Sequence, residues 1–202
     1  MLAGKSQEPG LLKAGVIGFG AFGRHHAGKY AALPGVALAA IADPSPWRGL
    51  ILSAPYFDVA LPVPAAKVLA GKLASRVIPR FGLPSGLHGS DVTRDPVRAR
   101  AYDEDPLVFK TVTARWYTES TEAQRRALAG ASSVTLPLYV LMGTADPVAK
   151  LDVARAFFDA AGSADKTWDV AEGLKHEVLN EPEWRPIADR IGEWVVAHAS
   201  VT

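Results

Sequence analysis

Two residues in the C-terminal half of the sequence, Asp146 and His176, have side chains suited to acid–base chemistry. Asp146 follows an apolar run at 138–142, and His176 follows a second strand-like run at 167–170. An acid after one strand and a histidine after the next is how two members of a Ser–His–Asp triad reach one edge of a parallel sheet. We therefore predict that they form a catalytic acid–histidine pair. Alternatively, Asp146 only caps the following helix or turn and His176 is an ordinary core or surface histidine.

The third member of such a triad would be a serine in a G-x-S-x-G elbow, where small neighbours permit a strained turn. The 202 residues contain no G-x-S-x-G. Ser53 follows a strand candidate, but Ala54 and Pro55 after it do not suit an elbow. We therefore predict an acid and a base without their nucleophile, and little or no turnover.

A glycine-rich G-x-G-x-x-G motif lies near the start of the chain, between a strand candidate and a helical pattern. A second strand candidate, 36–42, ends in Asp43. In dinucleotide-binding units such glycines let the backbone approach a pyrophosphate at a helix N-terminus, and the acid binds the ribose. The residues that would bind NAD or NADP are Gly18, Gly20, Gly23 and Asp43. Alternatively the glycines shape a turn and bind nothing, in which case no cofactor is needed.

The composition narrows the remaining classes of function. The net charge of +1 gives no basic footprint for nucleic acid, and no apolar run is long enough to span a membrane. The absence of cysteine excludes disulfides and thiolate metal sites and is typical of a reducing compartment, so we expect a cytoplasmic protein with no metal. The oligomeric state is left open.

Five strand candidates, at 14–18, 36–42, 49–53, 138–142 and 167–170, could share one parallel sheet, which predicts an α/β fold. Several short helical patterns lie between the third and fourth candidates. In the first of them, 65–77, the apolar residues Val68, Leu69, Leu73 and Val77 form one stripe. This insertion is either a lid over an apolar pocket or a packing element, and both alternatives predict that the stripe faces inward. The closing helix, Trp184 to His198, is expected to leave His198 in solvent.

The segment Gly49-Leu50-Ile51-Leu52-Ser53-Ala54-Pro55 resembles the strand after the nucleophile in monoacylglycerol lipases and lysophospholipases of the α/β-hydrolase fold. Tyr102–Val108, Thr113–Trp116 and His176–Pro182 are similar to later motifs of that family, so the resemblance covers about 48–198. It implies a partial α/β-hydrolase parallel sheet with a helical lid at about 56–133. It also implies that Asp146 is the triad acid, that His176 is the general base, and that the substrates are lipid esters.

The segment from Val16 to His26, followed by Val36–Ala42, resembles the opening of the Gfo/Idh/MocA oxidoreductases, whose Rossmann-like β-α-β unit binds NAD or NADP. The chain therefore has a chimera-like organisation: a leader at 1–12, a Rossmann-like segment at 13–47 and a hydrolase portion at 48–202. Two alternatives to a hydrolase relative follow. One is an NAD(P)-binding oxidoreductase fragment, and the other is an inactive lipid-binding or scaffold module.

Overall fold

A computed structural model describes residues 12–14, 36–38, 48–58 and 65–199 of the chain, which divides into the units Met1–Trp47 and Arg48–Thr202. In the first unit, β1 (Leu12–Ala14) pairs in parallel with β2 (Val36–Leu38). These strands form a two-stranded sheet. Residues 15–18 and 39–42 of the first two predicted strands lie outside the described residues. The predicted dinucleotide-binding residues Gly18, Gly20, Gly23 and Asp43 lie outside the described residues.

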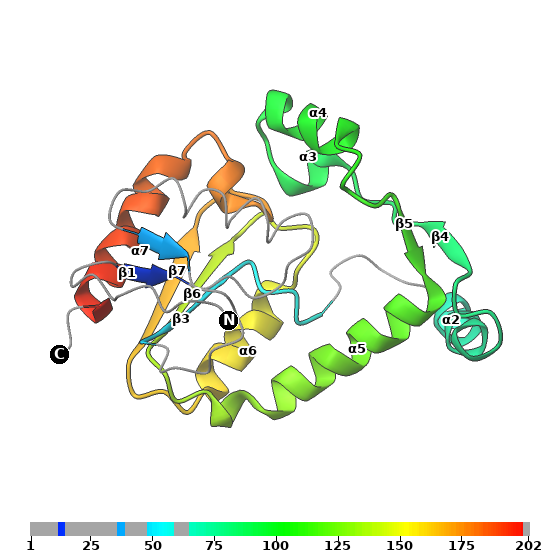
Figure 1. Ribbon diagram of the computed structural model, residues 1–202, viewed down its shortest axis with the longest axis horizontal. Helices are drawn as coiled ribbons and strands as arrows, with labels where there is room; N and C mark the ends of the chain where they lie inside the picture. The colour runs from blue at the N-terminus through cyan, green and yellow to red at the C-terminus, as the bar shows by residue number, and fades with distance from the viewer. Residues whose placement is uncertain (1–11, 15–35, 39–47, 59–64, 200–202) are drawn as a thin grey trace, which may run out of the picture. The chain divides into compact units, whose positions relative to one another are not determined.

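The second unit contains a parallel sheet of three strands in the order β3-β6-β7 (Figure 1). The strands are β3 (Leu50–Ser53), β6 (Leu138–Gly143) and β7 (Lys166–Ala171). Every residue of β6 is buried, as expected for the central strand of a sheet covered on both faces. The predicted strands at 49–53, 138–142 and 167–170 are thus confirmed to within one residue at either end.

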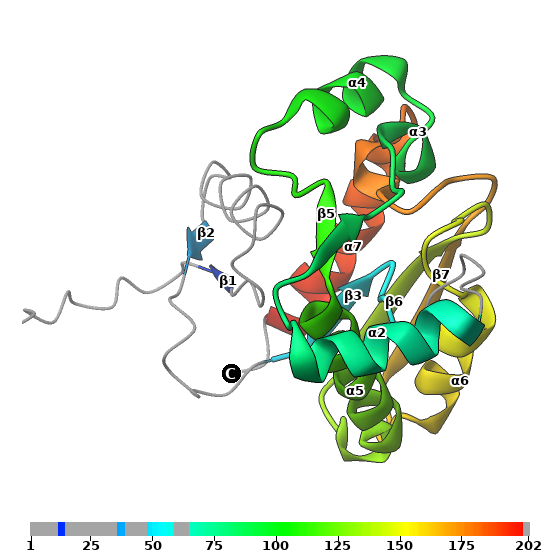
Figure 2. The same cartoon turned by 90° about the vertical axis from the view of Figure 1, so that its right-hand side faces the viewer.

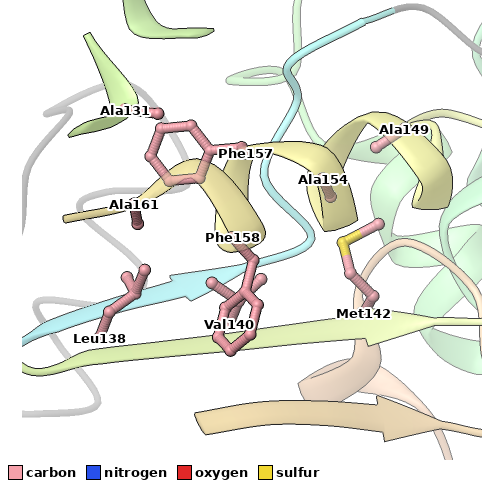
Figure 3. Close-up of a cluster of buried hydrophobic side chains, with 9 residues drawn as sticks. All are labelled: Ala131, Leu138, Val140, Met142, Ala149, Ala154, Phe157, Phe158 and Ala161. Carbon is pink, nitrogen blue, oxygen red and sulfur yellow. The ribbon is translucent and has the colours of Figure 1, made fainter. Parts of the chain in front are cut away.

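Alternate residues of β6 enter two different cores, because successive side chains of a strand point to opposite faces. One core lies under α6 (Leu151–Ala160), and Figure 3 shows it. Its buried residues are Ala131, Leu138, Val140, Met142, Ala149, Ala154, Phe157, Phe158 and Ala161. Each large apolar side chain buried in this way contributes about 1.5–3 kcal/mol. The strand and helix on either side of Asp146 are therefore firmly held.

The other core lies under α7 (Trp184–Ala199), where Tyr139 and Leu141 of β6 meet Ile187. The Tyr139 hydroxyl donates to Asp169 of β7, and Asp169 also accepts from Arg190 Nη2 at 2.9 Å. Burial, followed by the hydrogen bond to the Asp169 carboxylate, raises the pKa of Tyr139 above its ordinary value. The network joins the central strand, the neighbouring strand and the closing helix.

An insertion separates β3 from β6, at the place where the sequence predicts one (Figure 2). Its elements are α2 (Ala65–Val77), β4 (Gly82–Pro84), α3 (Gly89–Val92), α4 (Pro96–Glu104), β5 (Thr111–Thr113), α5 (Ala114–Ala129) and the 3-10 turn η1 (Ala131–Ser133). The antiparallel pairing of β4 with β5 was not predicted. The prolines and glycines of 78–86 favour a broken connector, and only the distant partner makes a strand of it.

Three of the four residues in the apolar stripe of α2 face outward, so the prediction that the stripe faces inward is wrong for all but the half-buried Val68. Leu69, Leu73 and Val77 are 71%, 65% and 71% exposed. The helix contacts α5 through a different face, which carries Gly71 and Ser75, and the Ser75 hydroxyl lies 2.7 Å from that of Thr118. Small residues on this face let the two helices approach closely, which leaves the larger apolar side chains outside.

Candidate active site

Asp146 and His176 lie together beyond the carboxyl ends of β6 and β7. The Nδ1 atom of His176 is 2.9 Å from Oδ2 of Asp146. The aspartate side chain is 1% exposed and the histidine side chain 22%. A carboxylate at Nδ1 holds the proton on that nitrogen in the neutral ring, so Nε2 is the basic atom. The arrangement can accept a proton at Nε2 and stabilise the resulting imidazolium.

Asp146 also serves the turn in which it stands. Its second oxygen, Oδ1, accepts hydrogen bonds from the backbone N–H groups of Val148 at 2.7 Å and Ala149 at 3.0 Å. This is the turn role that the sequence offered as an alternative to the pair with histidine. The two roles occur together, because each uses a different oxygen of the carboxylate. The turn therefore orients the oxygen that faces His176.

Gly143 lets the histidine loop cross the end of β6. A Cβ atom on Gly143 would lie 2.3 Å from the Leu174 carbonyl oxygen and 2.6 Å from that of Lys175. Ala145 N–H donates to the same Leu174 oxygen at 3.0 Å. The loop turns at Gly173, whose φ of +71° is a left-handed conformation that glycine adopts without strain. Backbone contact between the acid's turn and the histidine's loop thus sets their separation.

Two buried apolar residues flank His176 along its loop. Leu174 is 5% exposed and Val178 is not exposed at all, and both belong to the core under α7. Val178 opens a 3-10 turn, η2 (Val178–Asn180), that leads into α7. The histidine is therefore held between two anchors, and its ring stays partly accessible.

The insertion also contacts the histidine loop. Glu177 N–H donates to the Val92 carbonyl at the end of α3 at 2.8 Å. Glu181, which is completely buried, accepts from the backbone N–H groups of both Arg94 and Lys175. Sequence reasoning gave Glu181 no role, because a single glutamate before a proline carries no signal of burial.

Tyr102 of α4 lies near three carboxylates, of which Glu177 belongs to the histidine loop. Burial raises the pKa of the Tyr102 hydroxyl to about 12, and the carboxylates of Glu177, Asp103 and Asp91 add to the shift. The hydroxyl therefore remains protonated at neutral pH and is a hydrogen-bond donor rather than a base.

Ser53, the serine that follows a strand candidate, is the last residue of β3, and its side chain is exposed. The next residue, Ala54, has a φ of +44° and is 5% exposed. Within residues 48–58 and 65–199, no group of His, Asp and Glu side chains could hold a metal ion. None of the helices that the structure describes is both long and apolar enough to cross a membrane.

The geometry has counterparts among known proteins. Residues 35–183 match the family model described as serine aminopeptidase, S33. The chain is 30% identical over 164 residues to a monoacylglycerol lipase of Mycolicibacterium smegmatis, covering 77% of this chain and 55% of that protein. It is 30% identical over 136 residues to the phospholipase YtpA of Bacillus subtilis, covering 67% and 52%.

A solved structure agrees with these matches. The crystal structure of the Paleococcus ferrophilus monoacylglycerol lipase superposes with a TM-score of 0.71 at 29% identity, covering 77% of this chain and 61% of that one. The chain spans about half the length of the two curated relatives. The family match begins at residue 35 rather than 48, so it includes Asp43 and leaves the three glycines of the G-x-G-x-x-G motif outside.

Proposed function

This chain belongs to the serine aminopeptidase S33 family, and we propose that it is a relative of the serine carboxyl-ester hydrolases that act on monoacylglycerols or lysophospholipids. The observation that carries the proposal is the 2.9 Å contact between His176 Nδ1 and Oδ2 of Asp146, whose side chain is 1% exposed. In this assignment Asp146 fixes the tautomer of the ring. His176 Nε2 takes the proton of a serine hydroxyl and later gives it to the leaving alcohol.

Lipid esters are the preferred substrates because the relatives that align with most of this chain are named as lipases and a phospholipase. The exposed apolar residues of the insertion also favour a substrate with a long acyl chain over a peptide. Any residual hydrolysis of a monoacylglycerol, a lysophospholipid or an aminoacyl anilide tests this choice. Release of product from the anilide alone would contradict it.

The 202 residues contain no G-x-S-x-G, so we propose that this chain by itself turns over little or no ester. Without an activated serine, His176 has no hydroxyl from which to take a proton. A fluorophosphonate probe reacts with activated serines and is expected to leave the folded protein unlabelled. Stoichiometric labelling that disappears in His176→Gln would show that some serine is activated and would contradict the proposal.

Binding of lipid without hydrolysis is a second candidate function. It is favoured by the exposed Leu69, Leu73 and Val77 on α2 and by Phe109, which is 85% exposed. Titration with a non-hydrolysable ether analogue of a monoacylglycerol tests it. Leu73→Asp is expected to weaken binding at least tenfold, whereas Val196→Asp, an exposed apolar position on α7, serves as the matched control. Equal binding by both variants would contradict this candidate.

The glycine motif makes NAD or NADP binding a third, separate possibility. It depends on Gly18, Gly20, Gly23 and Asp43, and it requires no residue of the Asp146–His176 pair. Calorimetry with both dinucleotides tests it. Gly20→Val is expected to abolish any heat of binding, because a side chain there would block the approach of the pyrophosphate. The absence of heat from the unaltered protein at millimolar cofactor would exclude this possibility.

A further inference from the structure

Glu181 accepts hydrogen bonds from two segments that are far apart in the sequence. Its Oε1 atom accepts from the backbone N–H of Lys175 at 2.8 Å. Its Oε2 atom accepts from Arg94, through the backbone N–H at 2.9 Å and the side-chain Nε at 3.2 Å. The Thr93 hydroxyl lies 3.4 Å from Oε2 as well. One carboxylate therefore joins the histidine loop to the insertion.

The burial of the Glu181 carboxylate shows that its hydrogen bonds to the histidine loop and the insertion are needed to hold it ionised. Glu181 is 0% exposed, and an ionised carboxylate removed from water is costly unless donors surround it. Here both oxygens face donors only, and one donor is the positively charged Arg94 guanidinium. The carbonyl of Glu181 also accepts from Trp184 N–H at 3.1 Å at the start of α7, so its backbone is held too.

The position of Lys175 makes the contact relevant to chemistry. Lys175 directly precedes His176, and its backbone N–H is the group that Glu181 holds. The side chain of Lys175 donates to the Ser90 carbonyl of α3, and Glu177 N–H donates to that of Val92. The residues on both sides of His176 are thus tied to the insertion, and Glu181 supplies the buried, charged member of this set.

We propose that Glu181 is a positioning residue, which fixes the ring of His176 against Asp146 and couples it to Thr93–Arg94 of the insertion. A displacement of that segment then moves Lys175 and changes the contact between His176 and Asp146. The inference rests on the proposed function for the role of His176 as a base. The positioning itself is measurable in the absence of turnover.

Glu181→Gln is the decisive variant because glutamine has nearly the same shape. The carboxylate accepts at both oxygens, whereas an amide accepts at one atom and donates at the other. Whichever way the amide is turned, its N–H group faces either the N–H of Lys175 or the N–H donors of Arg94. The hydrogen bonds to either Lys175 or Arg94 are therefore lost. Glu183→Gln is the matched control, because Glu183 contacts the same Arg94 but is 56% exposed.

The measurement is the tautomer of His176, read from imidazole ¹H–¹⁵N correlations of the whole chain, with the signal assigned by its loss in His176→Gln. In the unaltered protein we expect the neutral ring to carry its proton on Nδ1. Glu181→Gln is expected to shift the His176 signals and to mix the two tautomers. Glu183→Gln is expected to leave them unchanged, and the His198 signals should not move in either variant.

Unchanged His176 signals in folded Glu181→Gln would overturn the proposal, even if that variant were less stable, since Glu181 would then be structural only. If Glu181→Gln does not fold, Arg94→Leu decides the matter, because it removes the side-chain donor to Glu181 Oε2 and keeps the backbone N–H, at a side chain that is 38% exposed. A smaller His176 shift in Arg94→Leu supports the proposal, and no shift overturns it. Ester hydrolysis and probe labelling are scored separately, so failure of the proposed function would leave this readout intact.

Discussion

The molecule contains two histidine–aspartate pairs with the same separation and different surroundings. His176 contacts Asp146 through Nδ1 at 2.9 Å, and His198 contacts Asp165 through Nε2 at 2.9 Å. The Asp146 side chain is 1% exposed, whereas that of Asp165 is 58% exposed. The first pair connects two loops at the edge of the sheet, and the second connects the end of α7 to the start of β7.

The second nitrogen of each ring separates the two pairs chemically. His198 Nδ1 lies 2.6 Å from the Trp194 carbonyl oxygen, so both of its nitrogens face acceptors and only the imidazolium satisfies both. In the described part of the chain, Nε2 of His176 has no hydrogen-bond partner. His176 can therefore exchange a proton, whereas His198 holds one. Proximity of histidine to aspartate does not by itself make a catalytic pair.

His198 also corrects an expectation from the sequence, which placed it in solvent. Its side chain is 19% exposed and stacks on Trp194 with the ring centroids 4.0 Å apart. The hydrogen bond to the Trp194 carbonyl is the main cause that raises the pKa of His198 above 6.5; burial opposes it, and the Asp165 carboxylate adds to it. The cation lies in the last turn of α7, where the helix dipole also favours it. The sequence gave no sign of this, because Asp165 lies on another element.

Gly143→Ala should have the largest effect, because the His176–Asp146 pair depends on the close approach of the histidine loop to Gly143. Gly143→Ala places a methyl group 2.3 Å from a backbone oxygen, so the histidine loop must move. We expect a loss of about 3 kcal/mol in the free energy of unfolding, measured by urea denaturation, and loss of the His176–Asp146 contact by NMR.

Gly192→Ala on α7 is the control for this change, because nothing lies within 4 Å of an added methyl group there. We expect it to stabilise the protein by about 0.5–1 kcal/mol, since alanine costs less backbone entropy than glycine in a helix. If the two variants were equally stable, the close approach at Gly143 would not constrain the loop.

Asp146→Asn should have the next largest effect. The amide can keep its oxygen toward Val148 and Ala149, but it then presents an N–H to His176 Nδ1. We expect the ring to change to the Nε2–H tautomer and the protein to lose about 1–3 kcal/mol, as for a disrupted buried polar contact. Imidazole NMR and urea denaturation report the two effects. An unchanged tautomer would show that Asp146 does not set the protonation of His176.

His198→Gln should have a smaller effect that depends on pH. Because the folded pKa of His198 is raised above 6.5, its contribution is fully present below that pH and is lost as the pH rises through the folded pKa. We expect the variant to lose about 0.3–1 kcal/mol at pH 6 and to match the unaltered protein at high pH. Urea denaturation at several pH values measures the difference. A difference that grew with pH would show that His198 is held in its neutral form.

Asp165→Asn should have the smallest effect, because the Asp165 carboxylate is largely in solvent. We expect a loss of about 0.2–1 kcal/mol that shrinks as salt is added, since salt screens an exposed ion pair. Urea denaturation at low and high salt tests this. A loss as large as that of Asp146→Asn would remove the distinction between the two pairs.

The sequence by itself determined the three strands of the second unit, the closing helix α7, and the placement of Asp146 and His176 in the loops that follow two of the strands. These are local properties. An uninterrupted apolar run such as 138–142 is typical of a buried strand, whatever its partners are. The boundaries of these strands differ from the predicted ones by one residue, because the last residues of an element depend on its partners.

Only the tertiary structure decided which faces and charges are buried. The stripe of α2 has the pattern of an inward face and is exposed, because Gly71 and Ser75 supply the contact with α5. A glutamate is usually a surface residue, yet Glu181 is buried. The sequence does not show this, because its donors at Arg94 lie 87 positions away along the chain. Periodicity reports how a segment would fold, whereas burial of a charge depends on partners that are adjacent only after the chain has folded.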